Sequence, residues 1–331
     1  MTTTKKTLAA MLGTIAMASV TGGCVLQQSD PSEYREAIPQ QGDAQLAFAG
    51  TQASGGTTGQ STSTKLHIQG LGGGGGTDYA SFYEFTRTVS DGVDTGTLLI
   101  LAEVEVVTSF PPTSHSGNEA VWGPGGDALD PVQWKLTVTK TADHEFDYEV
   151  DGRPHGSTDN SAWQSILTGH GYSHAHALYR SGSFTLDGDK LQALDPTRSN
   201  GGKVAVKYDA RAWPKTITAD VTTSDGTGQW YDITVGHAED GGGTVVVTAM
   251  ADISSPPDGK NESVDENSRW NSTGAGRADV KMSGGDLSST VLASQCWSSQ
   301  FAQTFYTDSV NYQPTAGDAS TCVFAQAQFN Q

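Results

Sequence analysis

Strict alternation of apolar and polar residues is the strongest pattern in this chain, and it begins after residue 130. Residues 134–139 alternate, and residues 146–150 alternate again on the far side of a turn at Asp143 and His144. Because successive side chains of a β-strand point to opposite faces, this pattern predicts a hairpin with one apolar and one polar face. Further strands, separated by turn signals rich in Gly, Asp and Pro, are expected at residues 181–186, 203–209, 216–223, 230–238, 244–253, 268–271, 277–283 and 290–297.

A helical period precedes these strands. Five side chains recur at the i, i+3 and i+4 spacing of a helix, namely Tyr79, Phe82, Tyr83, Thr86 and Val89. Asp91-Gly92, which follows them, is a helix stop signal. Residues 98–107 fit a strand by their β-branched side chains and a helix by their spacing, before two prolines end the element. Shorter helices are expected at residues 159–167, 189–194 and 321–328.

Together these elements predict the fold class. Consecutive strands without long helices between them pair antiparallel, and a sheet of eight or more strands curls. The apolar early helices need a surface to pack on, and the concave side of the sheet offers one. We therefore predict an α+β fold in which N-terminal helices pack on a large, curved, mostly antiparallel and half-barrel-like sheet, within a single globular domain over residues 79–331.

The beginning of the chain has the features of a lipoprotein signal. Lys5 and Lys6 precede an apolar stretch that is too short to span a membrane, which is typical of a secretory signal peptide. Residues 20–24 resemble a bacterial lipobox, in which the cysteine after the cleavage point receives the lipid, although Thr21 stands where Leu or Val is usual. We expect a signal peptide over residues 1–23 and lipidation, with palmitate among the acyl chains, at Cys24. An ordinary cleaved signal with a chance cysteine is the alternative.

The lipobox resemblance also implies a location. Val25, rather than Asp, follows the cysteine, and in lipoproteins this favours sorting to the outer membrane. Residues 24–78 are rich in Gly, Ser, Thr and Gln, a composition that buries too little apolar surface to offset the entropy of ordering. We expect them to be a flexible tether with a reach of roughly 40 Å. The glycine run at residues 72–76 lacks the Lys-Ser/Thr of a phosphate-binding loop.

Charge and composition exclude some classes of partner. The chain has 331 residues, with 37 acidic against 19 basic side chains, and its formal net charge is −18. Loss of the two lysines in residues 1–23 would make the charge −20. A surface this acidic repels nucleic acid, so no nucleic-acid partner is expected. We expect contact with the membrane through the lipid anchor, and an apolar ligand or an envelope glycan as candidate ligands; no cofactor is expected.

The cysteines fit an oxidising compartment. If Cys24 is lipidated, Cys296 and Cys322 remain, and an even pair in the cell envelope suggests a disulfide. A metal site or a catalytic thiol is the alternative, but the sequence has no C-x-x-C motif and no histidine near either cysteine.

Several segments resemble a known group of proteins. They are residues 110–114 (FPPTS), 120–124 (AVWGP), 134–138 (WKLTV), 148–154 (YEVDGRP), 182–187 (GSFTLD), 274–279 (GAGRAD), 283–287 (SGGDL) and 296–297 (CW). Over roughly residues 79–329 the chain resembles uncharacterised lipoproteins of myxobacteria and related bacteria. The resemblance implies a lipid-anchored protein with helices followed by a sheet, and favours a helix over residues 98–109. It implies no activity and no site residues.

Histidines form the densest cluster of candidate chemical groups. On a strand, His174 and His176 would share a face, and with His170 they form a candidate site for a divalent metal ion. Solvated loop histidines are the alternative. Residues 171–175 (GYSHA), centred on Ser173, differ from a G-x-S-x-G elbow by one residue, but that motif needs a parallel sheet, which the strand-rich pattern argues against.

Acidic turns and aromatic residues offer weaker candidates. Residues 187–189 and 258–266 carry oxygen ligands suited to calcium, but neither matches the EF-hand loop. Tryptophans near turns are candidates for a sugar-stacking surface, although aromatic side chains on strands are more often part of the core.

The sequence therefore favours a lipid-anchored protein of the cell envelope, of unknown function and with a non-enzymatic binding or structural role. A carrier of an apolar ligand in the concavity of the sheet is one alternative. A metal-dependent hydrolase that uses the histidines of residues 170–176 is the other.

Overall fold

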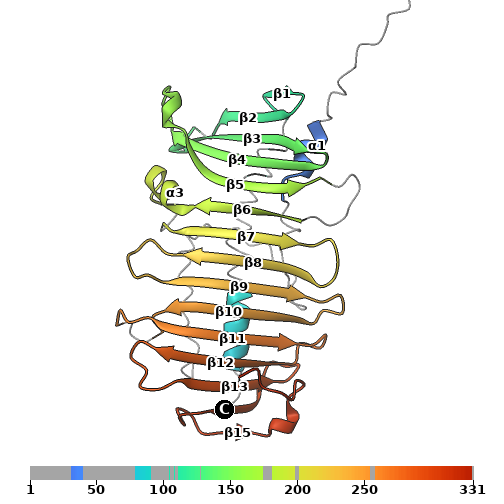
Figure 1. Ribbon diagram of the computed structural model, residues 1–331, viewed down its shortest axis with the longest axis vertical. Helices are drawn as coiled ribbons and strands as arrows, with labels where there is room; N and C mark the ends of the chain where they lie inside the picture. The colour runs from blue at the N-terminus through green and yellow to red at the C-terminus, as the bar shows by residue number, and fades with distance from the viewer. Residues whose placement is uncertain are drawn as a thin grey trace, which may run out of the picture.

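The computed structural model describes residues 31–39, 79–90, 104, 108, 111–126, 128–173, 181–197, 201–253 and 258–329. Fifteen strands in this part of the chain form one antiparallel sheet, in which every strand pairs with its neighbours in sequence (Figure 1). The sheet is open, with β1 and β15 at its two edges, so the predicted large antiparallel sheet is confirmed. Its strands are β1 (Ser114–Ser116), β2 (Glu119–Gly125), β3 (Val132–Ala142), β4 (Glu145–Pro154), β5 (Gln164–Tyr172), β6 (Ser181–Asp187), β7 (Lys203–Asp209), β8 (Lys215–Thr222), β9 (Trp230–His237), β10 (Gly243–Ala251), β11 (Glu262–Trp270), β12 (Gly276–Gly284), β13 (Val291–Trp297), β14 (Gln303–Asp308) and β15 (Ala316–Gly317).

Alternation along the strands gives the sheet an inner, apolar face and an outer, polar face. The strand register aligns inward side chains in rows across many strands. One such row runs from β6 to β13 through Phe184, Val206, Ala219, Ile233, Val247, Glu266, Val280 and Ala293. All eight are buried, and all except Glu266 belong to one hydrophobic cluster.

At four glycines of the inner face, a large ring from the neighbouring strand fills the space that the missing side chain leaves. The directly paired residues are Tyr148 with Gly169, Tyr208 with Gly182, Trp270 with Gly243, and Trp297 with Gly276. A Cβ atom at any of these glycines would overlap the paired ring. The ring covers the backbone that glycine leaves exposed and keeps the sheet packed where alternation fails.

Few helices accompany the sheet in the described residues. They are α1 (Pro31–Glu36), a helix over residues 81–90, α3 (Gly188–Leu194), and the 3-10 turns Asn160–Ala162 and Ala319–Thr321. The helix predicted at residues 189–194 is therefore confirmed. Residues 104 and 108 are helical, in agreement with a helix over residues 98–109, whose other positions lie outside the described residues.

Residues 31–39 are ordered, which differs from the flexible tether expected over residues 24–78. Tyr34 is fully buried, and its ring packs edge-on against Phe146 of β4 and His115 of β1, with centroids 5.3 Å away in both pairs. Its hydroxyl donates to the Gly117 carbonyl, and Lys140 pairs with Glu33 at 2.8 Å. The apolar face of one short helix thus suffices to order a segment inside a polar region. Residues 40–78 lie outside the described residues.

The helix over residues 81–90 packs on the inner face at the other end of the sheet. Four members of its predicted stripe are confirmed, since Phe82, Tyr83, Thr86 and Val89 are buried, but Tyr79 lies before the helix and is 48% exposed. Tyr83 stacks on Phe301 and tilts against Trp297. The Phe82 amide donates to the Gln295 side chain of β13 at 2.7 Å, which satisfies one of the free N–H groups at the start of the helix.

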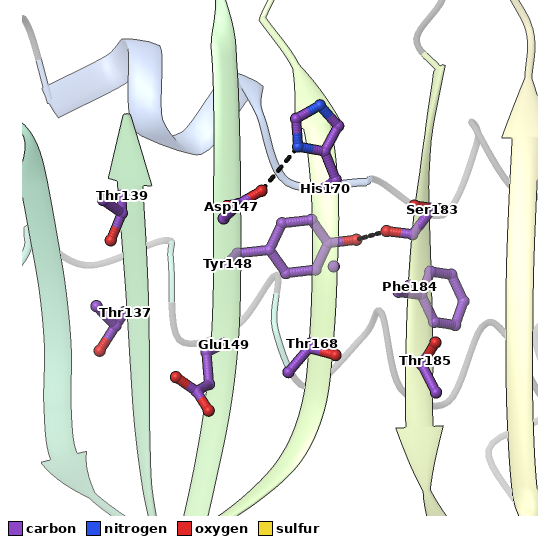
Figure 2. Close-up of a pocket in the computed structure, with 11 residues that line it drawn as sticks. Thr137, Thr139, Asp147, Tyr148, Glu149, Thr168, His170, Ser183, Phe184 and Thr185 are labelled. Carbon is purple, nitrogen blue, oxygen red and sulfur yellow. Dashed lines mark hydrogen bonds and ion pairs between the residues drawn. The ribbon is translucent and has the colours of Figure 1, made fainter. Parts of the chain in front are cut away.

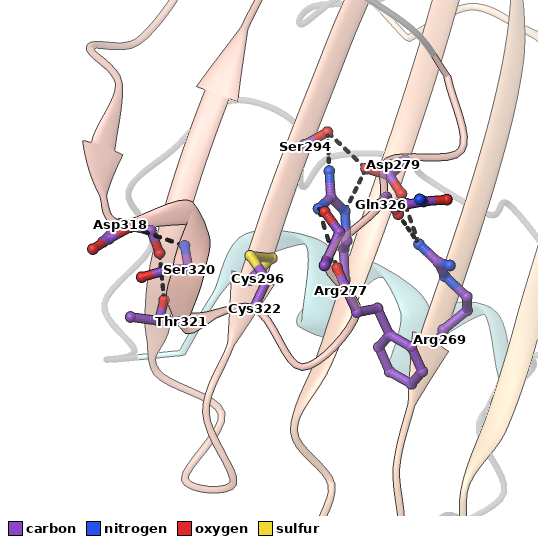
Figure 3. Close-up of a disulfide and its surroundings, with 12 residues drawn as sticks. Arg269, Arg277, Asp279, Ser294, Cys296, Asp318, Ser320, Thr321, Cys322 and Gln326 are labelled. Atoms are coloured by element: carbon purple, nitrogen blue, oxygen red, sulfur yellow. Dashed lines mark hydrogen bonds and ion pairs between the residues drawn. A yellow bond between two sulfur atoms is a disulfide. The ribbon is translucent and has the colours of Figure 1, made fainter.

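The predicted disulfide joins Cys296 in β13 to Cys322 in the C-terminal segment (Figure 3). Beyond it, the chain crosses the outer face of β11–β13. There Arg277 donates to the carbonyls of Phe324 and Ala325, and Arg269 donates to that of Gln326. Asp279 bridges the two arginines and is almost fully buried. These bonds hold residues 324–328 without regular structure, so the helix predicted at residues 321–328 was wrong apart from one 3-10 turn.

The helix predicted at residues 159–167 was also wrong. One 3-10 turn forms there, with the Asp159 side chain accepting from the Ser161 amide, and β5 begins at Gln164. Gly169 and Gly171 supply no apolar side chains, so β5 shows no alternation in the sequence.

Candidate functional site

The outer face has a concavity of about 430 Å³ over β3–β6 (Figure 2). Two cross-strand rows of outward side chains line it. One row is Thr137, Glu149, Thr168 and Thr185, and the other is Thr139, Asp147, His170 and Ser183. All eight side chains carry groups that can donate or accept hydrogen bonds, and the strand register places each directly beside the next. The concavity is therefore a two-row array of five hydroxyls, two carboxylates and one imidazole.

The one charged contact inside the array joins neighbouring strands. His170 Nδ1 lies 2.7 Å from Asp147 Oδ1, and the His170 ring meets the edge of the Tyr172 ring with centroids 4.9 Å apart. The side chain of Asp147 is 61% exposed and that of His170 is 33% exposed, so both are in contact with solvent. Asp147 fixes the orientation of the imidazole and leaves Nε2 directed away from it.

The floor of the concavity is rigid. The Tyr148 ring covers Gly169, and its hydroxyl donates to the backbone carbonyl of Ser183 at 3.1 Å, which ties β4 to β6 across β5. Burial raises the pKa of Tyr148 well above its ordinary value, with a smaller contribution from Tyr208. This phenol therefore stays neutral and has a structural role.

The chemistry of the array is that of recognition by hydrogen bonds. Carboxylates and hydroxyls accept hydrogen bonds from ligand hydroxyl or amine groups, and threonine and serine also donate. Asp147 and Glu149 face the concavity, and its only basic side chain, His170, is already paired with Asp147. The site thus suits a ligand rich in hydroxyl or amino groups rather than an anion.

Of the predicted histidines, the structure places only His170, which lies in β5 and faces outward. His174 and His176 lie outside the described residues, as does Cys24. The predicted metal site therefore stays a prediction. Ser173 follows an antiparallel strand, and its amide donates to the His144 carbonyl, which is not the strand-to-helix turn that a nucleophile elbow needs.

A different cluster, missed in the sequence, unites Glu33, Asp143 and His144, whose ligand atoms lie within 4.8 Å of one another. The Lys140 ammonium occupies the same place, 2.8 Å from Glu33 Oε1 and 3.9 Å from Asp143 Oδ1. The cluster therefore behaves as a set of ion pairs, in which the Lys140–Glu33 pair joins α1 to the β3–β4 hairpin and Asp143 contacts Lys140 and His144 within the hairpin.

The acidic turn at residues 187–189 uses its carboxylates within the fold. Asp187 accepts from the Lys190 amide and caps α3. Asp189 accepts from the Ser224 hydroxyl and the Gly202 amide, and these bonds lower the pKa of its carboxyl. A helix cap at Asp187 and loop hydrogen bonds at Asp189 account for both carboxylates within the fold.

The two rows could not be recognised in the sequence, because the register of three strand pairs creates them. Asp147 and His170, for example, are 23 positions apart. A weak signal exists, since polar positions in the predicted strands hold mostly Thr, Ser and Asp rather than Lys or Glu.

Comparisons with known proteins gave no match among family models, curated proteins or solved structures. Among the described residues, no helix has the length and apolar character needed to cross a membrane.

Proposed function

We propose that this protein is a lipid-anchored, non-enzymatic binding module of the cell envelope, and that its outer-face concavity binds an envelope glycan. Cys24 carries the anchor, with the outer membrane as its location, and the resemblance to myxobacterial lipoproteins supports this part. In the same proposal, N-terminal helices complete the cover of a half-barrel-like inner face.

The observation that carries the binding role is the array of eight adjacent hydrogen-bonding side chains over β3–β6. Sugars present hydroxyls at spacings of a few ångströms, and an array of acceptors and donors on neighbouring strands matches such a ligand. Because the backbone of a sheet is rigid, little side-chain and loop entropy is lost on binding. An open concavity also accepts an internal segment of a polymer, which a closed pocket would exclude.

The two alternatives have less support. A carrier of an apolar ligand needs free apolar surface, and the inner-face side chains between β2 and β14 are instead buried in one cluster. A metal-dependent hydrolase needs several ligands that converge, and His170 has a carboxylate partner at hydrogen-bond distance and lies on an exposed face.

Binding of the full chain to peptidoglycan sacculi and to purified lipopolysaccharide tests the proposal. The double variant Glu149→Gln/Thr168→Val removes one acceptor charge and one hydroxyl from the same row and preserves side-chain size. We expect its affinity to fall about tenfold or more, because hydrogen bonds to charged groups contribute roughly 1.5–3 kcal/mol.

The matched control is Asp220→Asn, which changes an outward carboxylate of β8 outside the concavity. It should bind as the unaltered protein does. Equal affinities for the double variant and the unaltered protein would place the ligand elsewhere, and absence of binding to both glycans would refute the glycan role.

A further inference from the structure

The position of α1 limits the length of chain between the proposed anchor and the fold. Only six residues, 25–30, separate Cys24 from Pro31, where α1 begins. Seven fully extended residue steps span at most about 25 Å. A tether that ended at residue 78 would allow a much longer separation, so the docking of α1 decides how far the domain can lie from the bilayer.

The contacts of α1 are specific to one corner of the sheet. Tyr34 contacts β1 and β4 through His115 and Phe146, and Lys140 in β3 pairs with Glu33. At β5, the Ala37 carbonyl occupies the space where a Cβ of Gly171 would lie. These contacts join the segment after Cys24 to strands β1–β5 at the end where the β3–β4 turn lies (Figure 1).

This corner also carries the concavity on its opposite face. Phe146 and Gly171 point inward to α1, and the adjacent residues Asp147 and His170 point outward into the concavity. In Figure 2, α1 and the residues that follow it run behind the strands that bear these two side chains. The segment that contains α1 and the candidate site thus lie on opposite faces of the same two strands, β4 and β5.

The negative charge of the domain keeps the rest of the sheet away from anionic lipid. Without residues 1–23 the formal net charge is −20, and anionic headgroups repel such a surface. The fourteen spacings between fifteen strands amount to roughly 65 Å, so the β15 edge is far from α1. Only the corner that the short segment restrains is held near the lipid.

We infer that α1 clamps the lipid-anchored N-terminal segment to the β1–β5 corner, so that this corner and its concavity face the bilayer surface while the β15 edge projects away from it. This rests on the proposed anchoring of Cys24. It defines the ligand further as a glycan presented close to the membrane, such as the sugar headgroup of a lipid.

Energy transfer to labelled vesicles tests this orientation. The full-length lipidated protein is reconstituted into phosphatidylethanolamine/phosphatidylglycerol vesicles that contain a headgroup acceptor dye. A donor dye is attached at Asp143→Cys in the β3–β4 turn, whose side chain is 86% exposed, or at Tyr312→Cys beyond β14, whose residue is 69% exposed. The native Cys296 and Cys322 are bonded to each other, so the added thiol is labelled selectively.

We expect transfer from position 143 to be at least twice that from position 312. Two further variants, each carrying the donor at position 143, test the clamp itself. Insertion of forty Gly/Ser residues between Asp30 and Pro31 lengthens the chain between Cys24 and α1. Tyr34→Ala removes the ring that packs against His115 and Phe146 and so releases α1 from the sheet. Both changes should reduce transfer at least twofold. Circular dichroism of the Tyr34→Ala variant confirms that the sheet is retained, and the insertion leaves every described contact unchanged.

The outcomes separate this inference from the function on which it rests. Mass spectrometry of the same preparation detects the acyl chains on Cys24, and their absence would refute both the anchor and the orientation. Acylated protein with equal transfer from both positions, or with transfer insensitive to the insertion, would refute the orientation alone.

Discussion

At the scale of single residues, glycine is decisive in this sheet because it creates space that another group fills. Gly171 illustrates this, since the Ala37 carbonyl lies where its Cβ would be. Gly169 has the same relation to the Tyr148 ring. Neither glycine has a left-handed backbone, so close approach, not conformational freedom, requires the missing side chain.

Gly171→Ala is therefore expected to displace α1. The added methyl group overlaps a backbone carbonyl, which cannot rotate away, so overpacking should cost about 1–3 kcal/mol in the free energy of unfolding. Hydrogen exchange should increase at residues 31–39 and little elsewhere. Gly125→Ala is the control, because a Cβ there has no atom within 4 Å among the described residues, and it should leave both measurements unchanged. Unaltered protection of α1 in Gly171→Ala would show that the helix does not depend on this contact.

Polar residues on the inner face show a second effect at the residue scale, and it was not visible in the sequence. Glu266 occupies an inward position between Val247 and Val280, where alternation predicts an apolar side chain. Only the docking of a helix distant in sequence explains it: Glu266 Oε1 accepts from Ser268 and lies 3.3 Å from the Thr86 hydroxyl. The contact spans 180 positions, so no local pattern could indicate it.

At the scale of elements, the helix over residues 81–90 covers this carboxyl. Glu266 Oε2 is buried and has no hydrogen-bond partner in the described part of the chain. Burial raises the pKa of Glu266 from 4.5 to about 8, and the hydrogen bonds from Ser268 and Thr86 oppose the shift. The carboxyl is therefore neutral at pH 7, and the interface between helix and sheet contains no buried charge from it.

The sign of the pH dependence follows from this pKa. Because the folded-state pKa exceeds the unfolded value, the folded protein holds a proton that the unfolded chain releases. The stabilisation is complete below pH 4.5 and is lost as the pH rises to about 8, at up to roughly 1.4 kcal/mol per pH unit. Urea unfolding of the protein and of Glu266→Gln, which cannot ionise, measures it. The variant should gain stability relative to the unaltered protein between pH 4.5 and 8, and parallel pH profiles would contradict the assignment.

Prediction from the sequence succeeded for elements whose signal is local. The hairpin around Asp143 and His144 is confirmed as β3 and β4, and His144 adopts the left-handed backbone of the turn. β5 was missed because the Tyr148 ring at Gly169 and the Ala37 carbonyl at Gly171 occupy the places of its own apolar side chains. The C-terminal helix failed because Arg269 and Arg277 bind the carbonyls that a helix would use internally. The candidate site depends on register and was not predictable.

At the scale of the whole molecule, a meander in which each strand contacts mainly its neighbours is weakest at its edges. The two edges are fastened by different segments. At the first, α1 bridges β1, β3, β4 and β5. At the other, the C-terminal segment is bonded to β13 through Cys296 and Cys322 and crosses the outer face of β11–β13, so opening from this edge must first displace residues 318–329.

Cys322→Ser tests how much of that resistance the covalent bond provides. The loop between the cysteines spans 26 positions, and its closure contributes roughly 3.5 kcal/mol in the chain-entropy model. We expect a loss of stability of this size and faster hydrogen exchange in β13 and β14, while β3–β6 stay protected. Cys296→Ala/Cys322→Ala should behave alike, which separates loss of the bond from the effect of a buried free thiol. In both variants Arg277 still donates to the Phe324 carbonyl, Arg269 still donates to the Gln326 carbonyl, and both arginines still bind Asp279. Residues 324–328 should therefore remain bound in the folded state. Exchange that accelerates equally in all strands would show that the sheet opens as one cooperative unit rather than from its edge.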